Sequence, residues 1–341
     1  MKVIVATGGT GGHIFPALEV AQELKRNGHD VVIAGAFRQW RERIKEEGFA
    51  TIELMARGLN RDSVMTLLLS SAIMLRATFD AFRILLKIKP NVVIGFGGYG
   101  AFPIVVAAGI LRLPTLFHEQ NVVPGRANKI LAFFVARIAV SFERSQKYFP
   151  KNKTILTGCP SHPTASALPA EEIFSKFGLQ NDRTTIFVLG GSQGSHRINM
   201  EFMGVMNNLR LMRKLQVIHV CGKEDYVALR AQYAEMGVQV SLHEFLKEIH
   251  LAYTIADLVI ARAGALTVTE IALAQRPAIL IPYPHAQNHQ KENALVLADA
   301  GVAKVLEEKD LAQTSLRQAI LAMLEQRPPS NSLAEVCSSM D

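Results

Sequence analysis

The sequence predicts an α/β protein built from two doubly wound, Rossmann-like domains. Three observations lead to this prediction: short β-branched runs alternate with longer helical patterns, the chain has 341 residues, and both halves open with a strand that leads into a glycine-rich turn. Alternation of this kind is typical of parallel sheets covered by helices. The length is too great for one compact core of ordinary size and fits about two domains.

Runs rich in valine, isoleucine and threonine mark the predicted strands, because branched side chains favour extended backbone. In the first half these runs are Lys2–Ala6, Asp30–Ala34, Ala50–Leu54, Asn91–Gly95, Pro114–His118, Ile138–Phe142 and Thr154–Gly158. In the second half they are Thr184–Gly190, Leu215–Val220, Val238–Leu242, Asp257–Arg262 and Pro277–Tyr283. The stretches between them are long enough for the helices of parallel crossovers.

A proline-rich break separates the two halves. The stretch Cys159–Ala170 (CPSHPTASALPA) contains three prolines and small polar residues, which is typical of a linker between domains. We therefore expect a first domain over 1–158, a linker over 159–170 and a second domain over 171–341, with the last helix packed back on the first domain. Doubly wound folds bind ligands at the carboxyl ends of their strands, so we expect the two domains to face each other across a cleft.

The composition narrows the compartment and the kind of partner. Hydrophobic residues make up 49% of the chain, and the three cysteines lie far apart without a CxxC pair, which favours the reducing cytoplasm. The net charge of +7 fits phosphorylated ligands or an anionic lipid surface. Basic residues form no block with interleaved aromatics, so we expect no nucleic-acid partner.

One uncharged stretch has the length of a membrane span. Asn91–Leu111 carries no charge over 21 residues. Four glycines between positions 95 and 100, together with Pro103, interrupt it and predict a strand, a turn and a short helix instead. We therefore expect a buried βαβ unit here. The first residues, MKVIVA, form a strand-like run, so no signal peptide and no membrane-spanning helix are expected.

The first glycine turn, Gly8–His13 (GGTGGH), does not match the common nucleotide-binding patterns. A dinucleotide fingerprint needs a third glycine where Ile14 stands and an acid after the second strand, and the chain has neither; the P-loop pattern is absent as well. The turn does place backbone N–H groups at a helix N-terminus, where they suit phosphate or another polar group. A tight structural turn explains the pattern equally well.

Metal chemistry has little support in the sequence. There is no HExxH motif and no pair of aspartates spaced as D-x-D to hold a divalent ion on a diphosphate. We therefore expect no metal site and no cofactor. Arginines and helix N-termini would have to stabilise any diphosphate.

Six motifs in fixed order resemble the MurG family of peptidoglycan N-acetylglucosaminyltransferases, which act on lipid I. They are GGTGGH (Gly8–His13), GFGGY (Gly95–Tyr99), HEQN (His118–Asn121), GGSQG (Gly190–Gly194), RAGALTVTE (Arg262–Glu270) and HQKENA (His289–Ala294). Each motif alone is weak, but the resemblance runs from residue 1 to about 325.

The resemblance implies the two-domain GT-B fold and an inverting transfer. The family moves N-acetylglucosamine from UDP-N-acetylglucosamine (UDP-GlcNAc), a substrate, to the 4-hydroxyl of the muramoyl sugar of lipid I, undecaprenyl-diphospho-MurNAc-pentapeptide, and so forms lipid II. Inversion implies one direct displacement, in which a base takes the acceptor proton while the departing UDP is stabilised electrostatically.

By the same resemblance the second domain binds the donor. Glu270 would accept hydrogen bonds from the ribose, although a solvated helix face also explains a glutamate there. Gln290 and Asn293, which share one helical face, would bind the sugar. Phe245, Leu246 and Ile249 would pack on the uracil, although plain core packing explains them equally well. The residues expected around the diphosphate are Ser192, Gln193, Gly194, Arg262, Gly264, Ala265, Leu266, Thr267 and His162.

The first domain would then bind the acceptor. Thr10, Gly11 and Gly12 belong to the glycine turn, and Tyr99, His118, Gln120 and Asn121 line the same side in the family. His13 is the candidate base, because an imidazole with an ordinary pKa near 6.5 accepts a proton at neutral pH. A helix-start histidine is often structural, and Glu119 is the rival base.

A lipid substrate implies contact with a membrane. Residues 64–89 are unusually apolar for a surface helix, and four basic residues, Arg76, Arg83, Lys87 and Lys89, interrupt them. This pattern predicts a patch that rests on anionic headgroups, although a buried helix with one basic edge is the alternative. We expect a peripheral protein on the cytoplasmic face of the inner membrane, in contact with a cell-wall synthesis complex that serves cell shape and division.

Two positions depart from the family pattern. His162 stands where the family has an arginine that reaches the donor diphosphate, and Ala263 replaces a serine. The loss of a permanent charge would leave more of that task to Arg262. These departures keep two alternatives open: a UDP-GlcNAc epimerase of the same fold, and a subunit that binds the donor without catalysis.

Overall fold

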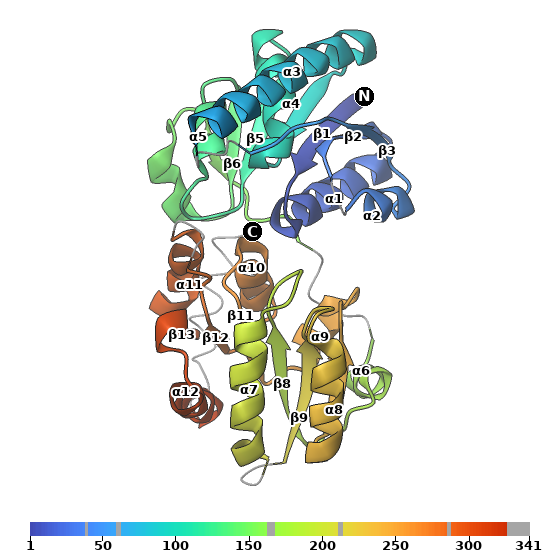
Figure 1. Cartoon of the computed structure of the whole chain (residues 1–341). Coiled ribbons are helices and arrows are strands. Elements are labelled where there is room, and N and C mark those ends of the chain that lie inside the picture. Colours follow the sequence, from blue (N-terminus) through green and yellow to red (C-terminus); the bar gives the residue numbers. More distant parts are fainter. Residues whose placement is uncertain (38–39, 59–62, 162–167, 211–213, 285–287, 326–341) are drawn as a thin grey trace. The chain divides into compact units, whose positions relative to one another are not determined.

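The structure is a computed structural model of the chain (Figure 1), and it describes all residues except 38–39, 59–62, 162–167, 211–213, 285–287 and 326–341. The chain divides into two compact units, with the boundary after Ser161. That boundary lies within the predicted linker, whose His162 is outside the described residues, as is the end of the predicted last helix. Each unit is described here by itself.

The first unit is a seven-stranded parallel sheet in the order β3-β2-β1-β4-β5-β6-β7. Its strands are β1 (Lys2–Gly8), β2 (Asp30–Ala36), β3 (Ala50–Glu53), β4 (Val92–Gly95), β5 (Thr115–Glu119), β6 (Arg137–Val140) and β7 (Thr154–Leu156). Its helices are α1 (Gly11–Arg26), α2 (Arg41–Glu46), α3 (Val64–Ile88), α4 (Gly98–Ile110) and α5 (Arg126–Leu131), with a 3-10 turn at Glu143–Tyr148.

The core of this unit lies on both faces of the sheet. Alternate residues of a strand point to opposite faces, so Ile4 and Ala6 of β1 pack with α3, α4 and α5. Val3 and Val5 pack on the other face with α1 and α2. A parallel sheet buried on both sides needs nearly continuous apolar strands, which explains why β1 is apolar through its middle.

The second unit is a six-stranded parallel sheet in the order β10-β9-β8-β11-β12-β13. Its strands are β8 (Thr184–Leu189), β9 (Leu215–Val220), β10 (Val240–His243), β11 (Leu258–Ala261), β12 (Ala278–Leu280) and β13 (Ala303–Val305). Its helices are α6 (Ala170–Phe177), α7 (His196–Leu209), α8 (Tyr226–Met236), α9 (Ile249–Ile255), α10 (Ala265–Leu273), α11 (His289–Asp299) and α12 (Gln313–Glu325), with a 3-10 turn at Glu308–Asp310.

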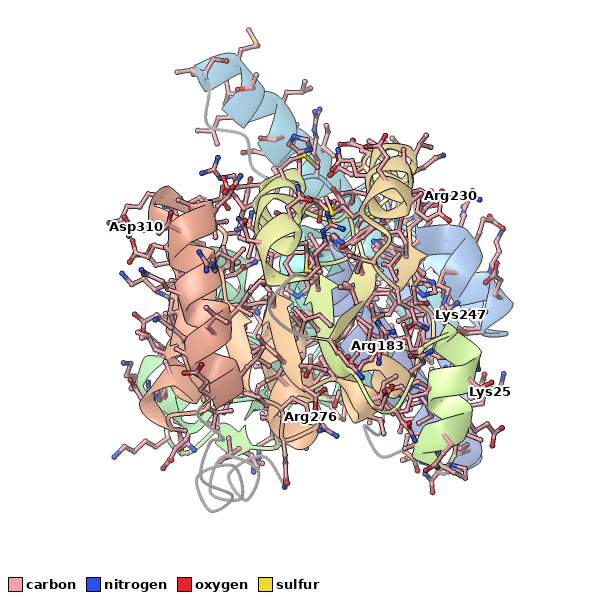
Figure 2. The ribbon with its side chains drawn as sticks, turned by 90° about the horizontal axis from the view of Figure 1, so that it is seen from below. Lys25, Arg183, Arg230, Lys247, Arg276 and Asp310 are labelled. Carbon is pink, nitrogen blue, oxygen red and sulfur yellow. The ribbon has the colours of Figure 1, made fainter. Side chains whose placement is uncertain are left out.

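Side chains of α7, α8 and α12 form one continuous core with β8, β9 and β11. On another part of the sheet, Phe187 of β8 meets Tyr253 of α9 with ring centroids 5.1 Å apart. Charged residues such as Arg230 and Asp310 are exposed and point outward (Figure 2). The unit therefore has the apolar centre and charged exterior of an independent domain.

The predicted fold class of two parallel, Rossmann-like domains is confirmed. The uncharged stretch Asn91–Leu111 forms β4, a glycine turn and α4, as predicted, and α4 is mostly buried. Strand β13 was not predicted, because it has only three residues and one of them is Lys304. It completes the sheet through pairing with β12.

Three glycines bring α4 directly onto the sheet. A Cβ atom at Gly35 would lie 1.8 Å from the Thr7 carbonyl oxygen, and one at Gly100 would lie 2.8 Å from the Gly8 Cα atom. Gly8 and Gly35 also adopt positive φ angles, of +155° and +145°. Backbone therefore touches backbone at these positions, and the N-terminus of α4 is held against the ends of β1 and β2.

Helix α3 exposes an apolar surface. Its buried residues are Ser70, Ala77, Ala81 and Leu85, and its side facing solvent includes Leu68, Leu69, Leu75, Phe79 and Leu86. Among the described residues, α3 is the one helix long and apolar enough to cross a membrane, with a mean hydropathy of 1.4 over its most apolar window. Only 17% of that window is buried in the structure.

Candidate active site

The predicted acceptor residues gather at the carboxyl ends of three neighbouring strands of the first unit. β1 pairs with β2 on one side and with β4 on the other, so the chain leaves β1 and β4 in opposite directions across the sheet. Ligands of doubly wound folds bind at such a switch point. His13 follows β1, Tyr99 follows β4, and the motif His118–Asn121 ends β5.

Two helix N-termini without bulky side chains meet at this point. Helix α1 begins at Gly11, after the exposed Thr10, and α4 begins at Gly98. A Cβ atom at Gly98 would lie 3.2 Å from Cδ2 of His13, so the imidazole packs directly over the first turn of α4. Backbone N–H groups at both N-termini can therefore approach a negatively charged or polar substrate group.

His13 is held by one amide side chain. Its Nδ1 lies 3.0 Å from Oε1 of Gln120, and the ring is partly buried. Burial lowers the pKa of His13 below its ordinary value, and the hydrogen bonds with Gln120 and the Phe96 backbone partly oppose this shift. His13 is therefore mainly neutral at neutral pH, as a base must be.

Four hydrogen-bond donors surround the carboxylate of Glu119. Its Oε1 accepts from the backbone N–H and the side-chain amide of Asn121 at 2.8 and 3.2 Å, and its Oε2 accepts from Asn128 at 2.7 Å and the Gly125 N–H at 3.3 Å. The pKa of Glu119 is raised, because the effect of burial exceeds that of the four donors, which favour the carboxylate and lower the pKa. Both oxygens are occupied, so the geometry favours His13 as the base and gives Glu119 the task of shaping the segment 121–128.

His118 binds the segment that follows β7. Its Nε2 lies 2.8 Å from the Gly158 carbonyl oxygen, which only accepts, so Nε2 donates. The side chain is buried, and burial lowers the pKa of His118 to about 4. His118 is therefore a neutral residue that ties β5 to the segment after β7.

In the second unit, the switch point lies between β8 and β11. The turn after β8 exposes Ser192 and Gln193. Gly194 has a φ of +79°, and a Cβ atom there would lie 2.1 Å from the Cys221 carbonyl oxygen. The turn is thus seated on the end of β9, with its backbone N–H groups close to the start of α7.

A buried polar network supports this turn, and the sequence did not point to it. The Asn199 amide donates to the Cys221 carbonyl at 2.9 Å and to Asp225 at 2.7 Å. Its oxygen meets Nε2 of His219 at 3.0 Å, and Nδ1 of His219 meets the Tyr233 hydroxyl at 2.9 Å. Burial lowers the pKa of His219 to about 3. An amide at a core-facing position of α7 is the signal that could have revealed the network.

The guanidinium of Arg262 makes its contacts with other residues of the second unit. Its guanidinium forms an ion pair with Glu308, donates to Oγ of Ser195 at 2.8 Å and to the Ile281 carbonyl at 3.2 Å, and lies 5.4 Å from the centre of the Tyr283 ring. Only 8% of the residue is exposed. Arg262 thus braces the start of α7 against the segment after β12, and Glu308 already balances its charge.

Glu270 lies on α10, whose first residues are Ala265, Leu266 and Thr267 after the N-cap Gly264. Its Oε2 accepts from the Tyr253 hydroxyl at 3.1 Å, and the side chain is buried. Burial is the main reason why the pKa of Tyr253 is raised, so this hydroxyl stays a donor. The contact orients the carboxylate that the sequence assigns to the ribose.

We predict that Glu270→Ala and Tyr253→Phe have different effects on donor binding, because Glu270 is expected to bind the ribose and Tyr253 only orients its carboxylate. If Glu270 binds the ribose as expected, the first change should raise the Kd for UDP-GlcNAc by about 10- to 100-fold, because a hydrogen bond to a charged group contributes roughly 1.5–3 kcal/mol. The second change keeps the acceptor and should raise Kd less than about fivefold. Titration calorimetry measures both values, and equal losses would contradict the assignment.

The remaining residues that are predicted to bind the sugar nucleotide lie on α11 and in the segment that follows β10. Gln290 accepts from the Tyr283 N–H at 2.9 Å, and the buried Asn293 donates to the Ala263 carbonyl at 3.2 Å, so α11 is tied to the segments after β11 and β12. Phe245 is exposed, and Leu246 and Ile249 are partly buried near the end of β10, at the sheet edge.

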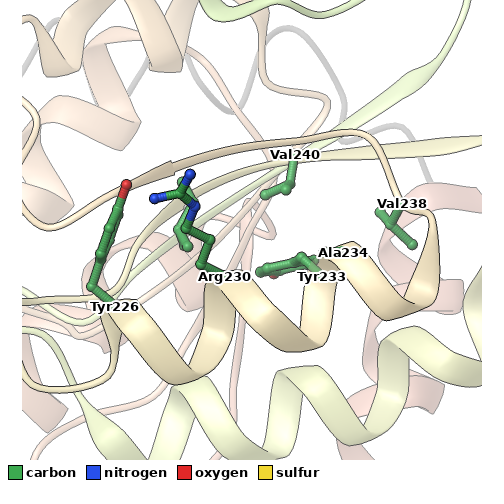
Figure 3. Close-up of a pocket in the computed structure, with 7 residues that line it drawn as sticks. Tyr226, Arg230, Tyr233, Ala234, Val238 and Val240 are labelled. Carbon is green, nitrogen blue, oxygen red and sulfur yellow. The ribbon is translucent and has the colours of Figure 1, made fainter.

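A pocket of about 450 Å³ lies elsewhere in the second unit, between α8 and β10 (Figure 3). Tyr226, Arg230, Tyr233 and Val240 are among the residues that line it, and they differ from the predicted site residues. Within the described part of the chain, no group of three or more His, Cys, Asp or Glu side chains has the arrangement of a metal site.

The sequence matches two models of one enzyme family. Residues 3–140 match the glycosyltransferase family 28 N-terminal domain, and residues 185–336 match the glycosyltransferase family 28 C-terminal domain. Together the two matches cover most of both units.

Two relatives are similar over nearly their whole length. A protein of Myxococcus xanthus is 36% identical over 325 residues, with 94% of this chain and 84% of the relative covered. One of Desulfitobacterium hafniense is 36% identical over 350 residues, with 100% and 95% covered. Both bear the name UDP-N-acetylglucosamine–N-acetylmuramyl-(pentapeptide) pyrophosphoryl-undecaprenol N-acetylglucosamine transferase.

Solved structures share the fold. A crystal structure of MurG from Acinetobacter baumannii is 30% identical, has a TM-score of 0.74, and is matched over 99% of this chain and 94% of that one. A UDP-N-acetylglucosamine 2-epimerase of Listeria monocytogenes has a TM-score of 0.69 over 99% and 92%, but at 12% identity it shows similarity of fold alone.

Proposed function

Because this chain belongs to the MurG family within glycosyltransferase family 28, we propose that it transfers N-acetylglucosamine from UDP-GlcNAc to the 4-hydroxyl of the muramoyl sugar of undecaprenyl-diphospho-MurNAc-pentapeptide. The product is lipid II, a precursor of peptidoglycan. The observation that supports this most directly is the similarity to the named transferases, at 36% identity along almost the entire chain. The position of His13 over a glycine-lined helix N-terminus is consistent with it.

The proposed reaction is a single displacement. The acceptor oxygen attacks the anomeric carbon, its proton passes to the His13 imidazole, and the bond from that carbon to the UDP oxygen breaks with its electron pair on UDP. The first unit supplies the base. The second unit binds the donor through Glu270 and the turn at Ser192, Gln193 and Gly194.

The direct test uses the purified chain with labelled UDP-GlcNAc and a short-chain lipid I analogue. Label in the lipid together with an equal amount of free UDP is the expected result. UDP release or sugar isomerisation without any acceptor would favour the epimerase alternative. Donor binding without turnover, with and without vesicles, would favour the non-catalytic alternative, which the departures at His162 and Ala263 motivate.

The departing diphosphate would be stabilised by backbone N–H groups. Because Glu308 balances the charge of Arg262, we assign this task to the N-terminus of α10 and the turn before α7. A chain without the D-x-D pair depends on these groups, so we propose metal-independent chemistry.

Removal of metal ions by a chelator tests whether the reaction proceeds without a metal. We predict that turnover changes by less than about twofold after treatment with excess EDTA, because the leaving group relies on protein donors. Steady-state assays before and after addition of magnesium measure the effect. Restoration of a lost activity by magnesium would contradict the proposal.

Helix α3 is proposed to rest on the membrane that contains the lipid acceptor. One side packs along α4 through Ala77, Ala81 and Leu85, so α3 is anchored to the unit. The opposite side exposes Leu75 and Phe79, and basic residues follow toward its end. An apolar face with a basic margin suits an anionic membrane surface. We place the chain on the cytoplasmic face of the inner membrane, with cell-wall synthesis proteins that serve cell shape and division.

A charge on α3 should weaken this contact without changing the chemistry. Leu75 is 73% exposed, and we predict that Leu75→Glu lowers binding to phosphatidylglycerol vesicles at least about tenfold, because one buried apolar side chain contributes roughly 1.5–3 kcal/mol. Turnover with a soluble acceptor should stay unchanged. Val227→Glu, at a position 78% exposed on α8, is the matched control. Equal losses for both variants in a sedimentation assay would contradict a membrane role of α3.

A further inference from the structure

The side-chain amide of Gln120 has a fixed orientation. Its Nε2 donates to the Phe96 carbonyl at 3.0 Å and to the His118 carbonyl at 3.2 Å. Carbonyl oxygens only accept hydrogen bonds, so both protons of the amide nitrogen are used, and a reversed amide would place three oxygens against one another. The side chain is 1% exposed. The oxygen Oε1 must therefore be the atom that faces His13.

This orientation decides which nitrogen of His13 carries the proton. Oε1 of Gln120 lies 3.0 Å from Nδ1 of His13 and has no hydrogen to donate. Nδ1 must then be the donor, and in a neutral imidazole the other nitrogen, Nε2, has the free lone pair. The histidine backbone is also held in place, because the Thr7 hydroxyl donates to the His13 carbonyl at 3.0 Å.

The Nε2 atom of His13 lies close to the glycine-lined start of α4. A Cβ atom on Gly98 would lie 3.5 Å from Nε2 of His13, and Gly98 has no such atom. The residue has a φ of +72°, so a larger side chain is strained there as well. Gly98 therefore places no side chain over the edge of the imidazole that can accept a proton.

We propose that Gln120 is a positioning residue, which holds His13 as the Nδ1–H tautomer so that Nε2 receives the proton of the acceptor hydroxyl. In that step the oxygen–hydrogen bond of the hydroxyl breaks, Nε2–H forms, and Nδ1 keeps its proton on Gln120. The catalytic consequence rests on the proposed function, whereas the tautomer does not. Because Gln120 is buried and its amide fully engaged, it acts on the substrate only through His13.

A neutral partner also suits a base that works at neutral pH. A carboxylate in place of the amide would favour the imidazolium and raise the pKa of His13. The amide orients the ring with a smaller effect of this kind, so burial dominates and the pKa of His13 stays lowered. The pair therefore combines a fixed tautomer with an uncharged base.

The tautomer can be read without any turnover. Nitrogen chemical shifts of the full chain labelled with ¹⁵N-histidine distinguish a protonated from an unprotonated ring nitrogen, and His13→Asn assigns the signal. We expect Nδ1 of His13 to be protonated and Nε2 unprotonated above neutral pH. A predominant Nε2–H form would overturn the proposal, even if the chain proves to be an active transferase.

Two substitutions test the consequence for catalysis. Gln120→Met removes the acceptor, so His13 should become a mixture of tautomers and kcat should fall by about 10- to 100-fold, with KM for UDP-GlcNAc unchanged. Gln120→Glu fits the same place as the neutral acid, because its hydroxyl can donate to one of the Phe96 and His118 carbonyls while its other oxygen accepts from Nδ1, so it should restore the Nδ1–H signal.

Gln22→Met is the matched control, because Gln22 in the same unit also donates from its amide, to Glu47 at 2.9 Å, and lies outside the site. Its kcat and the His13 signal should be those of the unmodified chain. If Gln120→Met kept both the His13 tautomer and kcat, or if Gln120→Glu failed to restore the Nδ1–H signal, Gln120 would be a packing residue only.

Discussion

Replacement of His13 by alanine is expected to lower kcat by about 10²- to 10⁴-fold, because the acceptor hydroxyl loses its general base. The KM for UDP-GlcNAc should change little, since the donor is assigned to the second unit. Steady-state kinetics with a soluble lipid I analogue measures both constants. His29→Ala, in the same unit but remote from the glycine turns, should leave kcat unchanged.

The pH dependence of kcat tests whether His13 acts as a base. Burial lowers the pKa of His13 from the ordinary value of 6.5, so the neutral base persists to lower pH than it would on the surface. The kcat of the unmodified chain should therefore be constant at neutral pH and fall to half at a pH below 6.5. His13→Ala should lose this acidic limb. If the variant kept more than about a tenth of kcat from about pH 6 to 9, another group would be the base.

For Glu119, we expect a large loss of stability from a change that removes only its charge. Glu119→Gln turns one acceptor oxygen into an NH₂ group that faces other donors, such as Asn128. The free energy of unfolding should fall by about 3 kcal/mol, because buried donors next to a lost charged acceptor stay unsatisfied. Urea unfolding measures the change, and Glu143→Gln at an exposed position is the control.

Asn128→Ala tests whether Glu119 has a structural role or acts as the base. It removes the 2.7 Å hydrogen bond to Glu119 but keeps the carboxylate. If Glu119 shapes the segment 121–128, this variant should lose stability and kcat together, as Glu119→Gln does. A Glu119→Gln variant that unfolds like the unmodified chain but has no turnover would instead make Glu119 the base.

The fold was largely predictable because parallel strands buried on both faces leave long apolar runs in the sequence. The exception, β13, has three residues and a lysine, and only its pairing with β12 makes it a strand. Likewise, the switch points at the ends of β1 and β8 follow from the repeated strand–glycine–helix pattern.

The partners of the site residues were much harder to predict. Arg262 seemed available for a diphosphate, yet its charge meets Glu308, which lies far along the chain in an ordinary charged stretch. Gln120 acts through contacts with His13 and Phe96, which lie far from it along the chain and which no local pattern reveals. Sequence patterns thus predicted which residues surround the site, and only three-dimensional contacts suggest separate tasks for them.

The close packing of Gly8, Gly35 and Gly100 limits how this site can change during evolution. A methyl group at any of these positions would overlap a backbone atom, so no single substitution there can widen or narrow the site by a small step. Variation in acceptor preference must arise at neighbouring positions with room for other side chains, such as the exposed Thr10 and the partly exposed Tyr99. The part of the candidate site that positions the proposed base is thereby separated from the part that could adapt to a new acceptor.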